Sequence, residues 1–135
     1  PSWLFSVRMG ATTIWEHWDG MREDGTMWST DMNSFNHYAY GAVADWIYGV
    51  AAGIAPIEEA PGYRVFTLCP VADKRLGWLD VTLHTAYGTI RSAWHYEQER
   101  VRYDITVPEG SRALFTLEGR MEALSAGSYV RYGKR

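Results

Sequence analysis

Two side chains near the start of the chain could do acid–base or hydrogen-bonding chemistry. Glu16 lies between Trp15 and Trp18 and next to a long stretch rich in turn residues. Indole walls would exclude water from such a carboxyl group and raise its pKa toward a value useful for general acid–base catalysis. His37 carries an imidazole, which when neutral can donate or accept a hydrogen bond with a hydroxyl group. These residues are the first candidates for a functional site.

Each candidate also has a purely structural interpretation. A single carboxylate such as Glu16 is often a solvated group at the end of a helix, and His37 could pack or cap at the start of one. Trp15 and Trp18 are spaced i, i+3, which packing on one helix face explains without any ligand. Residue type and spacing alone leave both interpretations open.

No metal or cofactor site is predicted. The single cysteine, Cys69, excludes an internal disulfide and a zinc site made of several cysteines, and its place before Pro70 favours a buried, small apolar residue. His84 and His95 fall on separate predicted strands, and no third ligand accompanies them. The loop carboxylates lack EF-hand spacing and are explained by turn formation; they are Asp19, Asp24 and Asp31.

The composition is that of an ordinary folded domain. The chain has 135 residues, of which 47% are hydrophobic and 21% charged. Its net charge of −3 offers no basic surplus for a phosphate backbone, so the composition argues against a nucleic-acid partner. No apolar run approaches the roughly 18 residues of a membrane-spanning helix, which argues against a membrane role. Aromatic residues are abundant, at 15% of the chain.

The first 55 residues have helical spacing with an embedded loop. Residues 3–8 have a helical face that Gly10 ends, and residues 19–34 predict a long loop, a kind of segment that is often functional. Residues 35–52 predict a helix, capped by Asn33 or Ser34, that is apolar nearly all round. Such a helix is expected to be buried within a larger structure than these 55 residues can form. The start at Pro1, with neither Met nor signal peptide, predicts the interior of a longer protein and leaves the compartment unknown.

The second part of the chain has the period of strands. A segment rich in Pro and Gly, residues 55–62, separates the two halves, so the expected domains are residues 1–55 and 56–135. Short strands with turn signals at near-regular spacing predict an antiparallel β-sandwich. The expected strands are residues 63–68, 76–85, 89–96, 101–107, 113–117 and 128–132.

Two long motifs in the first half are specific enough to suggest a family. Gly10-Ala-Thr-Thr-Ile-Trp-Glu-His-Trp-Asp-Gly20 and Met32-Asn-Ser-Phe-Asn-His-Tyr-Ala-Tyr-Gly41 resemble the C-terminal part of the α-L-rhamnosidases of glycoside hydrolase family 78. Pro61-Gly-Tyr63 and Gly88-Thr-Ile-Arg-Ser-Ala-Trp94 resemble the family more weakly. The resemblance implies an α+β fragment: the last helices of an (α/α)6 barrel, followed by an antiparallel β-sandwich.

The resemblance also implies roles for the candidate residues. Glu16 would be the general base of an inverting mechanism, in which two carboxyl groups stand roughly 6.5–9.5 Å apart. The family's general acid lies further upstream and has no match here. His37 would contact the sugar, and Trp15 and Trp18 would offer apolar faces to its ring and 6-methyl group. His17 departs from the basic residue, often Arg, that the family has at this position.

Two hypotheses of different class follow. In the first, the chain is the C-terminal part of an enzyme that removes terminal rhamnose from glycosides or polysaccharides, inactive on its own because the general acid is missing. In the second, an aromatic-rich sandwich carrying Trp78 and Trp94 binds carbohydrate or supports the barrel without catalysis. Trp28 fits a sugar-stacking surface and a loop anchor equally well. The apolar helix 35–53 predicts either an oligomer or a helix folded onto the sandwich.

Overall fold

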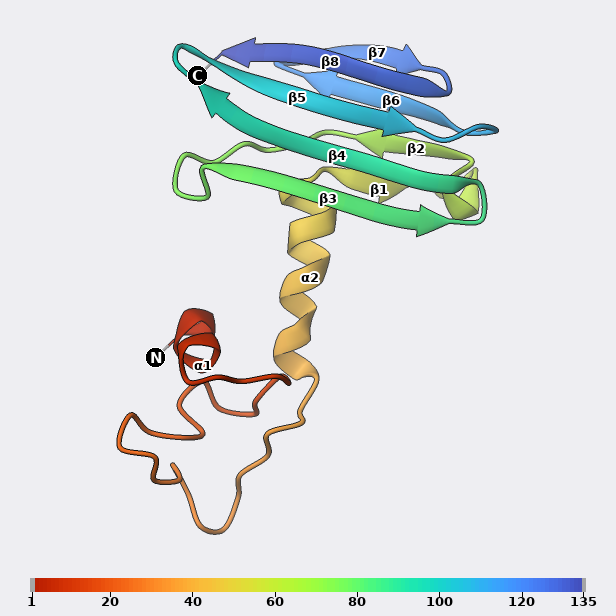
Figure 1. Cartoon of the computed structure of the whole chain (residues 1–135). Helices are drawn as coiled ribbons and strands as arrows, with labels where there is room; N and C mark the ends of the chain where they lie inside the picture. Colours follow the sequence, from red (N-terminus) through yellow and green to blue (C-terminus); the bar gives the residue numbers. More distant parts are fainter. Residues whose placement is uncertain (1, 135) are drawn as a thin grey trace. The chain divides into compact units, whose positions relative to one another are not determined.

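The computed structural model describes residues 2–134, which form two compact units. One unit ends at Ala44 and the other begins at Asp45. In Figure 1 the first unit is drawn in red and orange, and the strands of the second unit run from yellow to blue. No helix in the described part of the chain is both long and apolar enough to cross a membrane.

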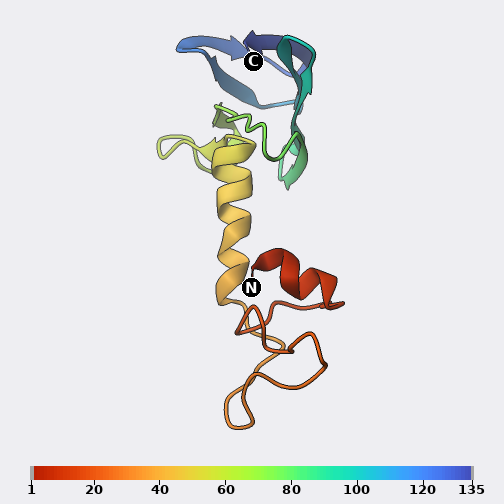
Figure 2. The same cartoon turned by 90° about the vertical axis from the view of Figure 1, so that its left-hand side faces the viewer.

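The first unit is mostly irregular. Its helix α1 (Trp3–Arg8) ends before Gly10, which has a φ of +82° that suits glycine, as the sequence predicted. The chain then continues to Tyr38 without another helix or named strand, and only an isolated bridge between Met21 and Met27 interrupts it. Figure 2 shows this long orange loop after the short red helix. A long loop is therefore present where the sequence predicted one.

The helix expected from residue 35 begins later than predicted. A 3-10 turn, η1 (Ala39–Ala42), leads into α2 (Val43–Trp46) and a π turn, η2 (Ile47–Ala51). The predicted caps at Asn33 and Ser34 are wrong: Tyr38 precedes the first turn and makes no side-chain capping bond. The reason is that Ser34 lies in a loop segment: its carbonyl oxygen accepts from the Glu16 amide, and its hydroxyl accepts from the backbone amide of Asn36 at 3.3 Å.

Several apolar side chains of this helical segment are exposed. They are Tyr40, Val43, Trp46, Tyr48 and Val50. At its C-terminal end, Ile47 packs against the core of the sandwich, and the Tyr48 hydroxyl donates to the Thr82 carbonyl oxygen at 3.3 Å. The last turn of the helix is therefore anchored on the strands of its own unit. Association through the exposed side chains stays a prediction.

The second unit contains the predicted β-sandwich. One sheet has the order β1-β2-β6-β7 and the other β3-β4-β5-β8 (Figure 1). The strands of the first sheet are β1 (Ile54–Pro56), β2 (Val65–Leu68), β6 (Arg112–Leu117) and β7 (Arg120–Leu124), with a 3-10 turn η3 (Pro61–Tyr63) before β2. Those of the second are β3 (Trp78–Thr85), β4 (Gly88–Glu97), β5 (Arg100–Val107) and β8 (Gly127–Lys134).

All six expected strands are present, with three differences. The structure adds β1 and β7, which the sequence pattern did not indicate. The expected boundary between residues 55 and 56 falls inside β1. The pairing of β2 with β6 is parallel, whereas every other pairing in the two sheets' described strands is antiparallel.

The core lies between the two sheets and follows the alternation of the strands. Its fully buried members include Phe66, Leu68, Ile90 and Phe115. Cys69, predicted to be buried, is exposed. Because Leu68 points into the core, the next residue along the extended chain points away from it.

The helical segment and the sandwich meet at a tight, polar junction. The Ser92 hydroxyl donates to the Ala52 carbonyl oxygen at 2.7 Å, and the Trp94 indole N–H donates to that of Ala51 at 2.8 Å. Gly53 has a φ of +70°, and a Cβ there would lie 2.1 Å from the carbonyl carbon of Cys69. Trp94 is thus a buried junction residue. Of the two tryptophans that favoured a carbohydrate-binding sandwich, only Trp78 is exposed.

Candidate functional site

Backbone pairing brings the two sequence motifs side by side. The amide of Glu16 donates to the Ser34 carbonyl oxygen at 2.8 Å, and that of His37 donates to the Ile14 carbonyl oxygen at 2.7 Å. A third bond runs from the Thr13 hydroxyl to the backbone carbonyl of Phe35. These bonds hold the candidate carboxylate and the candidate imidazole on adjacent segments of an otherwise irregular loop.

The side chains of Glu16 and His37 are both half-buried. The Ala39 amide donates to Nδ1 of His37 at 3.4 Å. Because an accepting nitrogen carries no proton, the neutral ring then holds its proton on Nε2, which stays available to donate to a ligand. Within residues 2–134, no hydrogen bond or ion pair joins the Glu16 carboxylate to a cation. The carboxylate is therefore not used by a structural salt bridge.

The two candidate tryptophans occupy different environments but line one cavity. Trp15 is 6% exposed and packs edge-on against Phe35, with 5.0 Å between ring centroids. Trp18 is more exposed and stacks on Tyr40 at 5.1 Å. A cavity of about 270 Å³ is lined by both indoles together with Trp3, Ser6, Val7 and residues 11–14. Glu16 and His37 are not among the residues that line it.

Further contacts hold the loop in shape. The Asn33 side-chain amide donates to the Gly20 carbonyl oxygen at 3.2 Å, so this residue closes the loop and does not cap the helix. His17 stacks on Trp28 with 4.1 Å between ring centroids, which gives Trp28 the anchoring contact that was one of its two interpretations. No pattern in the sequence predicts the pairing of His17 with Trp28, because the two rings meet only when the loop closes.

The acidic part of the loop is explained by turn formation. The Asp24 carboxylate accepts from the backbone N–H of Thr26 at 2.9 Å and from its hydroxyl at 2.6 Å, as expected for an Asx turn. These hydrogen bonds, chiefly that from the hydroxyl, lower the pKa of Asp24. No group of three or more His, Cys, Asp or Glu side chains suited to a metal ion occurs among the described residues.

Comparison with known protein families divides the chain in two. Residues 1–51 match the bacterial α-L-rhamnosidase six-hairpin glycosidase domain, and residues 53–130 match the bacterial α-L-rhamnosidase C-terminal domain. The chain belongs to the α-L-rhamnosidase family. It corresponds to the end of the six-hairpin domain plus the C-terminal domain. The expected family, and the expected order of barrel helices followed by a sandwich, are thereby confirmed.

Individual relatives agree with this assignment. An α-L-rhamnosidase from Formosa agariphila is 38% identical over 84% of the chain, and one from Streptomyces avermitilis is 35% identical over 84%. The chain spans 12% and 11% of these two proteins, respectively.

Solved rhamnosidase structures match nearly the whole chain. The rhamnosidase from Aspergillus terreus matches 98% of it with a TM-score of 0.88 and 31% identity, and the chain covers 16% of that protein. The Streptomyces avermitilis enzyme, solved in complex with L-rhamnose, matches 98% with a TM-score of 0.80 and 30% identity, and the chain covers 14% of it. The α-L-rhamnosidase fold of both halves is thus seen in experimental structures.

Proposed function

We propose that the chain is the C-terminal part of an inverting α-L-rhamnosidase that removes terminal α-L-rhamnose from glycosides or polysaccharides. The observation that carries the proposal is the pairing of the two motifs, which holds Glu16 and His37 on adjacent loop segments. Its support is the family match of the residues that form them. The activity belongs to the whole enzyme, of which this chain supplies one part.

Glu16 is the general base in this proposal. In an inverting glycosidase, the base accepts a proton from the water that attacks the anomeric carbon, while a carboxylic acid on the other side protonates the leaving oxygen. The half-buried Glu16 carboxylate is free of salt bridges to the described cations, so its charge remains available for that proton. The acid comes from a part of the enzyme outside this chain.

The neighbouring side chains suit a deoxy sugar. His37 has its Nδ1 occupied by the Ala39 amide, and its Nε2–H donates to a sugar hydroxyl. Trp15 and Trp18 contribute an apolar cavity wall of the kind that suits a methyl group and the C–H face of a ring. Trp18 is the more exposed of the two and gives the more direct contact.

The chain alone should be inactive, because one carboxyl group cannot provide both the acid and the base of an inverting mechanism. The decisive experiment therefore uses the full-length enzyme that contains this chain. Initial rates on an aryl α-L-rhamnoside are compared for the wild type and Glu16→Gln. Removal of a general base should lower kcat by about a hundredfold or more.

Glu23→Gln is the matched control. Glu23 is an exposed carboxylate of the same loop and has no part in the proposed chemistry, so this variant should keep the wild-type rate. Circular dichroism checks that both variants fold. An unchanged rate for Glu16→Gln would leave Glu16 a structural carboxylate and overturn the proposal. A wild type active only on another glycoside would keep the site and change its substrate.

A further inference from the structure

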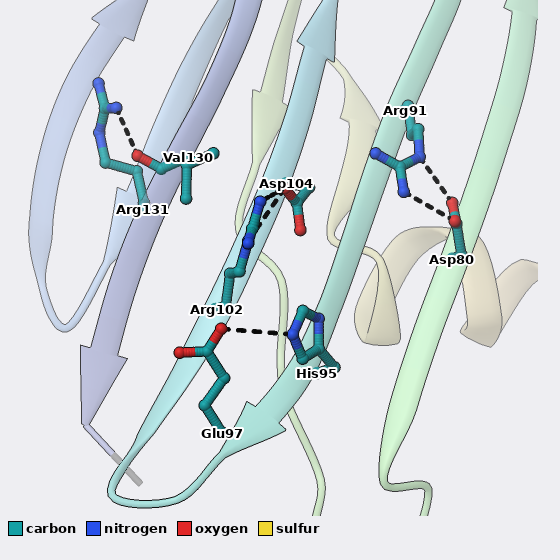
Figure 3. A network of polar contacts seen from close by, with 8 residues as sticks. All are labelled: Asp80, Arg91, His95, Glu97, Arg102, Asp104, Val130 and Arg131. Atoms are coloured by element: carbon teal, nitrogen blue, oxygen red, sulfur yellow. Dashed lines mark hydrogen bonds and ion pairs between the residues drawn. The ribbon is translucent and has the colours of Figure 1, made fainter.

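The outward face of the second sheet carries an ordered set of polar and aromatic side chains. Across its four strands, one row of the register runs Trp78, His95, Arg102 and Tyr132. The next row runs Asp80, Ala93, Asp104 and Val130. Figure 3 shows Asp80, His95, Arg102 and Asp104 from these rows, on strands β3, β4 and β5. We call the group Trp78, Asp80, Arg91, His95, Arg102 and Asp104 the sheet platform.

The Arg and Asp side chains of the sheet platform form two ion pairs. Arg91 makes two bonds to the Asp80 carboxylate, of 2.9 and 2.8 Å, and Arg102 reaches Asp104 at 3.2 and 2.8 Å (Figure 3). The guanidinium of Arg91 lowers the pKa of Asp80 below its usual value. Each pair combines one positive and one negative group, so the four side chains together carry no net charge.

The sheet platform contains a shallow hollow and one aromatic ring that is exposed to solvent. Ala93, between Asp80 and Asp104 in the register, has only a methyl group and forms part of the lining of an open hollow of about 500 Å³. Trp78 lines the same hollow from the edge strand β3 and is 68% exposed. At the opposite edge, the Arg100 guanidinium covers the Tyr132 ring at 3.8 Å, so that ring is already occupied.

This combination suits a neutral polyhydroxylated ligand. An exposed indole gives a flat apolar surface for the C–H face of a sugar ring, while fixed carboxylates and guanidinium groups accept from and donate to hydroxyl groups. Because each Arg is paired with an Asp, these four side chains have no net positive charge that would attract an anion. The two bonds between Arg91 and Asp80 limit the conformations of both side chains before a ligand binds, which lowers the entropy lost on binding.

We propose that the sheet platform is a carbohydrate-binding site, separate from Glu16 and His37, that takes a neutral rhamnose-containing oligosaccharide or polysaccharide. Trp78 stacks on a sugar ring, and the two Arg–Asp pairs with His95 bind its hydroxyl groups. The choice of rhamnose rests on the proposed function, whereas the existence of the site rests on the geometry of β3, β4 and β5. The site holds substrate near the enzyme and performs no bond cleavage.

The test measures binding by the chain itself, without hydrolysis. Isothermal titration with a neutral rhamnose-containing oligosaccharide should give saturable binding by the wild type. Trp78→Ala should raise Kd about tenfold or more, because stacking on the ring is lost. Trp46→Ala removes another exposed tryptophan and should leave Kd unchanged.

The outcomes separate this proposal from the proposed function. Binding that is lost in Glu16→Gln but kept in Trp78→Ala would overturn the site on the sheet. Absence of saturable binding by a folded wild type would overturn it too. Binding of a neutral glycan without rhamnose, lost in Trp78→Ala, would keep the site and contradict the choice of sugar. Trp78→Phe keeps a ring and should retain part of the affinity, which guards against a folding artefact in the alanine variant.

Discussion

The two units of the chain bury their side chains very differently. Among described residues up to Ala44, only Ser6, Trp15 and Gly20 are buried. The single strand β5 buries four: Val101, Tyr103, Ile105 and Val107. The sandwich therefore has a core of its own, whereas the loop that carries Glu16 and His37 is held by backbone hydrogen bonds and buries few side chains. In the matched family domain, six helical hairpins make up the barrel to which this loop belongs.

The largest expected effect tests whether the sandwich core is self-contained. Phe66 is fully buried between the sheets, so Phe66→Ala should lower the free energy of unfolding by about 3–5 kcal/mol. Hydrogen exchange followed by mass spectrometry should show lost protection in β4 and β5.

Phe35→Ala is the counterpart in the first unit. Phe35 is half-buried and packs on Trp15, so its removal should leave exchange in the sandwich strands unchanged. If Phe35→Ala destabilised β4 as much as Phe66→Ala does, the two units would share one folding transition and the contrast between them would fail.

The next effect concerns the junction where the helical segment enters the sandwich. Gly53→Ala places a methyl group against the backbone of Cys69 and forces an L residue to a φ of +70°, which should cost at least about 3 kcal/mol. Gly49→Ala is the matched control: it has open space around it and no positive φ. Denaturant unfolding that gave equal midpoints for the two variants would show that the close approach at Gly53 is relaxed at little cost.

The clearest strand signal in the sequence is regular alternation. In β5 every second residue is buried, and the pattern Val101-Arg-Tyr-Asp-Ile-Thr-Val107 already displays it. The two missed strands lack this signal: β1 has three residues and ends in Pro56, and β7 is exposed except for Leu124. The parallel pairing of β2 with β6 joins strands far apart in the chain, and no local pattern specifies it.

The residues of the candidate site could be predicted from the sequence, but their arrangement in space could not. Family resemblance indicated Glu16 and His37 as site residues. The backbone hydrogen bonds from Glu16 to Ser34 and from His37 to Ile14 are long-range, so no periodic pattern in the sequence predicts them. Trp78 and Trp94 looked alike in the sequence, since both fall in predicted strands. Only the register shows that Trp78 faces outward and Trp94 donates its indole N–H into the buried junction.

The smallest expected effect is a loss of sandwich stability at alkaline pH. Burial raises the pKa of Tyr103 to about 12 from a usual value of 10.0, with smaller contributions from Tyr96 and Glu118. Between these two pH values the unfolded chain releases this proton and the folded chain keeps it, so stability should fall as pH rises from 10 to 12. The loss by pH 12 should be about 2 kcal/mol.

Tyr103→Phe removes this ionisation, so its unfolding free energy should fall less steeply over the same interval. The comparison uses the slope against pH, since loss of the hydroxyl can shift stability by a constant amount at every pH. Urea unfolding at several pH values, followed by hydrogen exchange in β5, measures that slope. Parallel curves for the wild type and the variant would assign the alkaline loss to other groups. Ionisation of the buried Tyr103 would then be excluded as the cause of the loss of sandwich stability at high pH.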